Sequence, residues 1–190
     1  MDNQENKSLA VRLDRYDPSG FDRGRSKWLE MCWLLIQALF IGSWLPGNGM
    51  RIGLLRLFGA KIGKDVVIKP GLKVKFPWRL QIGDHCWLGE GVWIDNLDLV
   101  IIEDHCCISQ GAYLCTGSHD WSRETFDLIT KPIHIGKGAW LGAFSRVAPG
   151  TVIGAGAVLA LGSTGQGNME EWTIYQGVPA KAVRKRTISR

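Results

Sequence analysis

Residues 135–159 read IGKGAW LGAFSR VAPGTV IGAGAV L, with an aliphatic residue at every sixth position. The same spacing extends back to residue 62, with three breaks. Fourteen positions share it, and all are Ile, Leu or Val: Ile62, Ile68, Val74, Ile82, Leu88, Ile94, Ile102, Ile108, Leu114, Ile135, Leu141, Val147, Ile153 and Leu159. A fixed period of this kind indicates a chain built from one small structural unit that repeats.

The repeat predicts short strands joined by tight corners. Three strands close a triangular coil of about 18 residues, with the aliphatic side chain pointing inward. Parallel coils stack at about 4.8 Å, so each residue lies above its equivalent one coil earlier. Glycine suits the corners because it adopts backbone dihedral angles that are disallowed for residues with a side chain. The need for corners accounts for the 24 glycines among 190 residues. We therefore predict an all-β fold, a three-sided parallel β-helix over residues 61–190.

The breaks in the repeat differ in size. Those at residues 74–82 and 94–102 each add two residues at a corner, whereas the break at 114–135 inserts a long excursion. A regular prism tolerates a long loop mainly when the loop is functional. The sequence therefore predicts that the loop at residues 115–134 carries the functional site.

Residues 1–60 lie outside the repeat and are predicted to form a polar tail followed by an apolar helix. The tail does not match a secretory signal, and the apolar run from Trp28 to Leu45 is short for a membrane span, at about 27 Å as a helix. Two interpretations stay open. The helix caps the open end of the β-helix, or residues 28–45 lie peripherally on a membrane surface, helped by nearby basic residues.

Charge and cysteine content narrow the class of protein. A net charge of +5 with 45% hydrophobic residues excludes a disordered chain and does not require nucleic acid as a partner. Five cysteines without a C-x-x-C pair indicate the reducing cytoplasm, at the inner face of the cell membrane if the helix anchors there. Cys86 and Cys106 share one inward column, where a disulfide is geometrically allowed but cytosolic redox favours thiols.

Two histidines fall at equivalent positions of consecutive coils. His85 and His105 are expected to stack outside one corner, with Asp84 and Asp104 stacked beside them. Zinc usually takes three or four ligands, so we expect no metal at this column.

Three segments carry a resemblance to a known family. They are Ala112-Tyr-Leu-Cys-Thr-Gly-Ser-His119-Asp-Trp, the repeat from Ile135 to Ala143, and the tail Gly177-Val-Pro-Ala-Lys181. Over residues 55–186 the chain resembles the left-handed β-helix hexapeptide acyltransferases, most of all the colanic acid biosynthesis acetyltransferases and more distantly the maltose and galactoside O-acetyltransferases. The resemblance implies a left-handed coil, a homotrimer, and acetyl-CoA bound in a groove between neighbouring prisms.

The same resemblance implies the catalytic residue. His119 is expected to be the general base that takes the proton of an acceptor hydroxyl as its oxygen attacks the thioester carbonyl. A backbone N–H near Gly142 and Ala143 is expected to stabilise the oxyanion. Asp120 either orients the imidazole or is a solvated turn residue.

The cofactor contacts implied by the resemblance come from two regions. Gly142, Ala143 and Leu161 are expected to meet the pantetheine arm, while Lys181 and Arg184 are expected to meet the nucleotide phosphates, for which cationic side chains are suited. Beyond Arg184 the basic tail either extends this contact or is a solvated end. Residues 165–171 lack the lysine and the prolines that relatives have in this segment, so we expect fewer contacts to the cofactor from it.

The positions expected to bind the acceptor sugar differ more strongly from those of the family. The polar positions that hold the sugar in galactoside enzymes correspond here to Gly89 and Leu97, which cannot supply the same hydrogen bonds. Asp95 and Asn96, one coil below the histidine strand, are the candidate ligands of acceptor hydroxyls. Trp121 either stacks on a sugar face or packs at a subunit contact.

Together these features predict an acetyl-CoA-dependent O-acetyltransferase that acts on a saccharide hydroxyl during exopolysaccharide or envelope polysaccharide synthesis. Two alternatives stay open. One is a same-fold acyltransferase for another small acceptor, such as a xenobiotic, serine or a nucleotide-sugar amine. The other is a non-catalytic trimeric β-helix scaffold, which predicts no affinity for acetyl-CoA.

Overall fold

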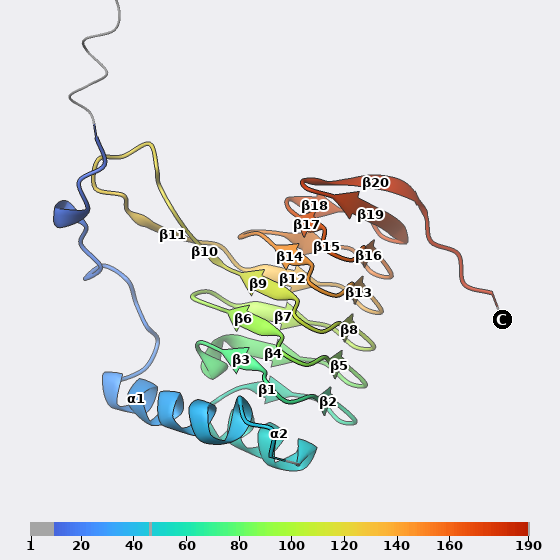
Figure 1. The fold of residues 1–190 in the computed structure, drawn as a ribbon, viewed down its shortest axis with the longest axis horizontal. Helices are drawn as coiled ribbons and strands as arrows, with labels where there is room; N and C mark the ends of the chain where they lie inside the picture. Colours follow the sequence, from blue (N-terminus) through green and yellow to red (C-terminus); the bar gives the residue numbers. More distant parts are fainter. Residues whose placement is uncertain (1–9, 46, 190) are drawn as a thin grey trace, which may run out of the picture.

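The computed structural model describes residues 10–45 and 47–189, and the chain folds as a solenoid of stacked parallel coils (Figure 1). The first nine residues of the predicted polar tail, Pro46 and the last residue of the basic tail lie outside the described residues. Successive coils contribute parallel strands to three sheets, which form the three sides of the prism, and one of these sheets ends in an added antiparallel strand near the C-terminus.

Successive strands of the six-residue repeat fall on the three sheets one after another. The six-stranded sheet has the order β1 (Lys61–Ile62), β4 (Leu80–Ile82), β7 (Val100–Ile102), β12 (Ile133–Ile135), β15 (Val152–Ile153), β18 (Asn168–Met169). The seven-stranded sheet has the order β2 (Val67–Ile68), β5 (Trp87–Leu88), β8 (Cys107–Ile108), β13 (Trp140–Leu141), β16 (Val158–Leu159), β19 (Thr173–Gly177), β20 (Ala180–Lys185). The five-stranded sheet has the order β17 (Thr164–Gly165), β14 (Arg146–Val147), β9 (Tyr113–Cys115), β6 (Trp93–Asp95), β3 (Lys73–Val74).

The aliphatic repeat forms the core, as predicted. In the register of the sheets Ile82 pairs with Ile102, and Ile102 pairs with Ile135, so equivalent residues stack in columns. Thirteen of the fourteen repeat residues are buried, and Ile62 at the open end is partly buried. Because a buried aliphatic side chain contributes about 1.5–3 kcal/mol, the columns supply most of the driving force for folding. The all-β fold class is confirmed.

Glycine has two separate roles in the coils, and one differs from the prediction. At the regular corners the third residue after the aliphatic position has a positive φ, as at Gly156 (65°) and His105 (59°); the exceptions follow Val74, Ile94 and Leu114, where the repeat is broken. The glycine directly after the aliphatic residue does not have a positive φ; it makes room for the next coil. A Cβ on Gly154 would lie 2.6 Å from the amide nitrogen of Glu171, closer than real Cβ contacts.

Two helices precede the coils, where the sequence predicts one. The α-helix α1 (Lys27–Ile36) begins at the N-cap Ser26, continues as the π-helical turn η3 (Gln37–Ile41) and ends at Gly42. A second helix, α2 (Asn48–Leu57), was not predicted, because two internal glycines weaken its helical pattern. None of the helices in the part of the chain described is long and apolar enough to cross a membrane.

The helices cover the first coil and satisfy its backbone (Figure 1). The indole Nε1 of Trp33 donates to the carbonyl of Val74 at 2.8 Å, and the Gln37 Oε1 accepts from the Val74 amide at 2.6 Å. The Asn48 side chain donates to Val66 O at 2.8 Å and accepts from the Ile68 amide at 2.7 Å. These bonds replace those that another coil would make, so the inner face of the helices is an end cap.

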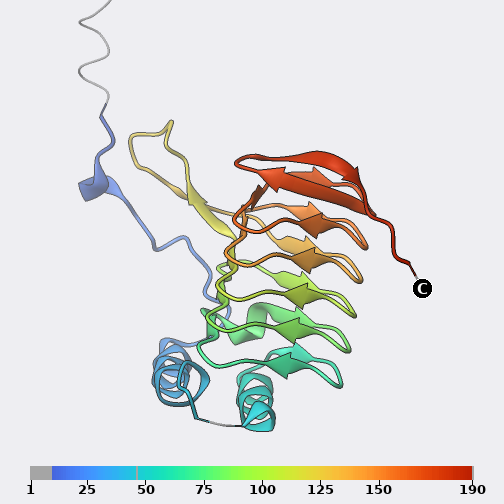
Figure 2. The ribbon, with the colours of Figure 1, turned by 45° about the vertical axis from the view of Figure 1, so that its right-hand side comes forward.

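Ahead of α1, residues 10–26 form an arm that includes the short 3-10 helix η2 (Leu13–Arg15) and runs beside the coils (Figures 1 and 2). Its upper end bonds to the long excursion, where the Arg12 amide donates to Glu124 O at 2.8 Å. Its lower end meets the 3-10 helix η4 (Pro77–Arg79), where the Trp78 indole donates to Arg23 O at 2.8 Å. The arm is therefore tied at both ends.

The stacked histidines lie as expected, with ring centroids of His85 and His105 5.0 Å apart and 11° between the planes. Beside them the Asp104 Oδ1 accepts a hydrogen bond from the Asp84 amide at 2.9 Å, so this aspartate side chain links the backbones of adjacent coils. No group of three or more His, Cys, Asp or Glu that would hold a metal occurs within residues 10–45 and 47–189.

The two cysteines that share an inward column, Cys86 and Cys106, are buried free thiols. The Cys86 Sγ bonds Glu103 O at 3.0 Å and the Cys106 Sγ bonds Gly136 O at 3.2 Å. The neighbouring Cys86 and burial both raise the pKa of the Cys106 thiol, so it stays protonated.

Candidate active site

The long excursion is a projecting hairpin. Strands β10 (Gly117–His119) and β11 (Leu128–Thr130) pair antiparallel, with His119 opposite Leu128. The hairpin leaves the prism after β9 of the five-stranded sheet and returns at β12 of the six-stranded sheet. It therefore stands at the corner between these two sheets, within the predicted loop of residues 115–134.

His119 is held by three contacts at the end of β10. Its Nδ1 lies 2.8 Å from the carbonyl oxygen of Phe126, and since a carbonyl only accepts, Nδ1 carries the proton in the neutral ring. The rings of His119 and Phe126 stack at 4.3 Å, and Tyr16 of the arm packs edge-on at 5.5 Å. This arrangement fixes the tautomer and leaves the lone pair on Nε2 available as a base.

Phe126 and Tyr16 have no signal in the repeat, so sequence reasoning missed them. Phe126 lies in the loop between the hairpin strands with φ of 50°, a conformation that turns its carbonyl toward the imidazole. Tyr16 lies about one hundred residues before His119, and only the path of the arm brings the two together.

Asp120 is a turn residue. Its Oδ1 accepts from both the amide and the hydroxyl of Ser122, and these bonds lower the pKa of the carboxyl group. The His119 Nδ1 is bonded to Phe126 instead, so the structure favours the second of the two interpretations of Asp120.

The predicted acceptor residues lie in different surroundings. Asn96 is fully buried, and its amide bonds the backbone of Phe76 on both sides, at 3.0 and 2.7 Å, and Arg79 O at 3.1 Å. These bonds hold the widened corner at residues 76–79, so Asn96 acts inside the fold, which corrects its expected role as a hydroxyl ligand. Trp121 lies at the hairpin tip and is 80% exposed.

Asp95 is partly buried in a small polar network on the five-stranded sheet. Its Oδ2 accepts from the Tyr113 hydroxyl at 3.1 Å, and its Oδ1 lies 3.5 Å from the Lys75 Nζ. Burial, followed by the neighbouring Cys115 and Asp95, raises the pKa of Tyr113, so the phenol stays a donor. Oδ1 is buried without a hydrogen-bond partner in the described part of the chain.

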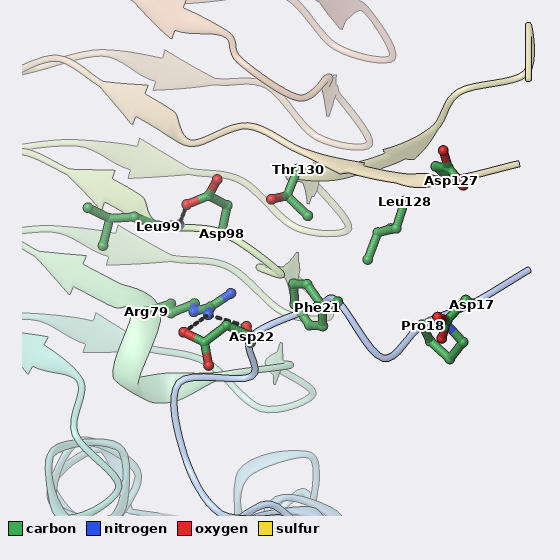
Figure 3. A pocket seen from close by; sticks show the side chains of 11 residues that line it. Asp17, Pro18, Phe21, Asp22, Arg79, Asp98, Leu99, Asp127, Leu128 and Thr130 are labelled. Carbon is green, nitrogen blue, oxygen red and sulfur yellow. Dashed lines mark hydrogen bonds and ion pairs between the residues drawn. The ribbon is translucent and has the colours of Figure 1, made fainter.

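A cavity of about 610 Å³ lies between the arm and the prism (Figure 3), and we call it the arm pocket. Its lining comes from the arm, the corners of two successive coils and the second half of the hairpin: Asp17, Pro18, Gly20, Phe21, Asp22, Arg79, Asp98, Leu99, Asp127, Leu128 and Thr130. Arg79 donates to Leu97 O and to Asp22 O, which joins arm to corner. Because Leu128 pairs with His119, the pocket borders the strand opposite the histidine. The sequence did not predict it.

A second cavity, of about 490 Å³, contains three of the predicted cofactor residues, and we call it the corner groove. Gly142 and Ala143 from one coil and Leu161 from the next line it together with Ser109, Gln110, Trp140, Val158, Leu159, Ala160 and Ile174. The lining is mostly apolar.

Lys181 and Arg184 lie on β20, the strand that folds back over β19. Both are exposed and are absent from the groove lining, but Arg184 pairs with Ile174, which lines the groove. The divergent segment 165–171 completes the last coil: Gly165 pairs with Val147, and the Glu170 carboxylate accepts from the Lys185 Nζ at 3.0 Å.

The histidine and the corner groove lie at different corners of the prism. The groove surrounds the turn from β13 to β14, which joins the seven-stranded and five-stranded sheets. His119 stands at the corner between the five-stranded and six-stranded sheets. The two parts of the predicted site are therefore separated within one chain.

No family model matches the chain. Curated relatives that match most of its length are named acetyltransferases. The chain is 40% identical over 171 residues to the putative colanic acid biosynthesis acetyltransferase WcaF of Escherichia coli, covering 89% of this chain and 93% of the relative. It is 23% identical over 138 residues to the galactoside O-acetyltransferase of Escherichia coli, covering 71% and 68%.

Two solved structures share the fold. A hexapeptide-repeat acetyltransferase of Vibrio cholerae, also solved with acetyl-CoA, superposes with a TM-score of 0.77 at 24% identity, covering 85% of this chain and 93% of that one. A galactoside acetyltransferase in complex with coenzyme A superposes with a TM-score of 0.76 at 20% identity, covering 84% and 82%. At these identities the structures show the fold alone.

Proposed function

Because the chain belongs to the acetyltransferase family of the putative colanic acid biosynthesis protein WcaF, we propose that it transfers acetyl from acetyl-CoA to a saccharide hydroxyl in exopolysaccharide synthesis. The observation that carries the proposal is the state of His119. A half-buried imidazole whose Nδ1–H is bonded to a backbone carbonyl presents Nε2 as a proton acceptor.

The proposed reaction uses that geometry. Nε2 of His119 takes the hydroxyl proton while the hydroxyl oxygen bonds to the thioester carbonyl carbon. The tetrahedral intermediate then breaks its carbon–sulfur bond, and the proton passes from Nε2 to the CoA thiolate. The Phe126 carbonyl, 2.8 Å from Nδ1, stabilises the imidazolium that forms between these steps.

The corner groove supplies the proposed acetyl-CoA site, and its backbone distinguishes the two predicted oxyanion donors. The Gly142 amide already donates to Leu159 O at 2.7 Å, so it is occupied. The Ala143 amide has no acceptor among residues 10–45 and 47–189 and borders the groove. We assign the Ala143 N–H to the thioester or pantetheine carbonyl, and Lys181 and Arg184 to the phosphates.

The arm pocket suits a polyhydroxylated acceptor. Four carboxylates line it, from Asp17, Asp22, Asp98 and Asp127, and ionised carboxylates accept hydrogen bonds from hydroxyl groups. Its volume of about 610 Å³ is in the range of small-molecule sites. Asp95 and Trp121 stay proposed contacts for parts of the saccharide beyond the pocket.

Substitution of Leu161 tests the groove. Leu161 is 73% exposed, so Leu161→Glu is expected to leave the fold intact while placing a carboxylate in an apolar site that binds an anionic ligand. We expect the dissociation constant of CoA, measured by calorimetry, to rise about tenfold. Leu161→Met is the matched control and should bind as the wild type does. A wild-type protein without measurable CoA affinity would support the scaffold alternative.

The separation of His119 from the groove supports a site shared between subunits of a homotrimer. In a closed ring the histidine corner of one copy meets the groove corner of the next. A His119→Ala chain and a groove variant carrying Leu161→Glu, Lys181→Glu and Arg184→Glu should each be inactive alone. Co-expressed, they are expected to recover about one quarter of wild-type activity, because random mixing leaves about that share of interfaces intact. No recovery in mixed trimers would place the whole site in one chain.

A further inference from the structure

The helical end of the molecule carries an apolar surface that the described residues do not cover. We call it the outer apolar face, and it consists of Trp28, Met31, Leu35, Leu39, Trp44 and Leu57, all exposed. Trp28 and Trp44 are 76% and 77% exposed, far more than a large aromatic side chain in a folded protein usually is. Exposed apolar residues that gather in this way mark an interaction site.

On α1, the outer apolar face is the reverse side of the end cap. Trp28, Met31 and Leu35 recur at intervals of three and four residues, so they share one side of α1. Trp33, on the other side, is fully buried and bonded to Val74 of the first coil. The helix is thus apolar on both sides, a pattern typical of a helix that is covered on both sides.

Basic residues concentrate at the same end. Residues 23–75 run from the end of the arm through α1 and α2 to the first coil, and they contain ten Lys or Arg and only two Asp or Glu. Arg51 is buried and bonded to the carbonyls of Ser43 and Leu45, so nine of the ten basic residues are available to a surface ligand. The whole chain has 23 basic and 18 acidic residues, so the remainder is net acidic. In Figures 1 and 2 these segments form one end of the prism, with α1 and α2 side by side beneath the first coil.

We propose that this end docks onto an anionic lipid bilayer, with the outer apolar face in the interface and the basic residues against the lipid headgroups. Anionic lipids attract basic residues placed near the surface. Tryptophan is enriched at the membrane–water interface. With ten residues in α1 and five in η3, the helix is shorter than the roughly 20 residues a membrane span requires, so a docked helix lies in the plane of the interface. A second copy of the chain fits less well, because pairing the same face would bring two strongly basic ends together.

Docking of this end sets the orientation of the molecule. The coils stack away from the helices, so the prism axis points away from the bilayer (Figure 1). The arm pocket is lined by the arm that precedes α1 and by coil corners, so it lies on the side of the prism. Docking itself requires neither acetyl-CoA nor the acceptor.

Vesicle sedimentation of the full chain tests the proposal. We expect binding to phosphatidylcholine vesicles that contain about one third phosphatidylglycerol, weaker binding to phosphatidylcholine alone, and a decline as salt is raised. Trp28→Ser with Leu35→Ser is expected to lower the partition coefficient about 100-fold, about tenfold for each side chain. Ile188→Ser is the matched control, since it removes an exposed apolar residue of the C-terminal tail and should bind like the wild type.

A second variant keeps the test independent of the helix packing. Arg25→Gln with Lys64→Gln is expected to lower binding to the anionic vesicles about tenfold and to leave circular dichroism and CoA affinity unchanged. Equal binding to neutral and anionic vesicles, or binding that neither variant lowers, would overturn the proposal. So would a wild type that ignores vesicles but forms a larger assembly than the Trp28→Ser/Leu35→Ser variant in light scattering, because the face would then be a contact between copies.

Discussion

Replacing His119 by alanine is expected to lower kcat for acetyl transfer by about 10²–10⁴-fold, the usual contribution of a positioned general base. The base is lost while the groove stays intact, because His119 and the corner groove lie at different corners of the coil. The affinity for acetyl-CoA should therefore be unchanged. Steady-state transfer to a saccharide acceptor and calorimetry with CoA measure the two quantities separately.

His105→Asn is the matched control for this substitution. His105 is an exposed histidine on an outer corner, with φ of 59°, and asparagine tolerates that left-handed conformation. The control should keep wild-type kcat. A His119→Ala enzyme that retains more than about a tenth of wild-type kcat would remove His119 as the general base and leave positioning of the substrates as the main source of catalysis.

Replacing Gly154 by alanine is expected to lower the free energy of unfolding by about 2–3 kcal/mol, although only one methyl group is added. The new Cβ would lie 2.6 Å from the Glu171 amide nitrogen and 2.8 Å from Met169 O, both backbone atoms of the next coil. Backbone cannot rotate away as a side chain can, so the coil must shift and lose register. Urea denaturation at a fixed protein concentration measures the change.

Gly53→Ala is the control for the methyl group itself. Gly53 lies in α2, and a Cβ built there meets no atom within 4 Å. Alanine is the better helix former by up to about 1 kcal/mol, so this variant should be as stable as the wild type or more stable. If Gly154→Ala unfolded at the same urea concentration as Gly53→Ala, close contact between coils would not be the reason for glycine at position 154.

The fold follows from local pattern. An aliphatic residue every six positions can be buried only if the chain turns a corner in each interval, so Ile135, Leu141 and Val147 fall on three successive sides of one coil. The same register predicted the stack of His85 on His105, because equivalent residues of adjacent coils are neighbours. The hairpin was predicted as an interruption of the repeat.

Features that depend on contacts between distant segments were not accessible from the pattern. Asn96 looked like a polar corner residue, yet its amide is used by the backbone of Phe76 and Arg79. The choice between the two roles of Asp120 depended on where the Phe126 carbonyl points. Neither the spacing nor the residue types contain that information.

The sequence by itself determined the coil, its core and the position of the histidine loop. The reason is that each repeat is fixed by residues six positions apart and packs against the equivalent repeat of the next coil. The tertiary structure decided how the arm crosses the coils to place Tyr16 against His119 and to form the arm pocket. It also decided that the inner face of the helices caps the first coil while the opposite face stays exposed. The physical reason is that a repeat specifies neighbours at fixed separation, whereas the arm and the cap make single contacts over long separations that no period encodes.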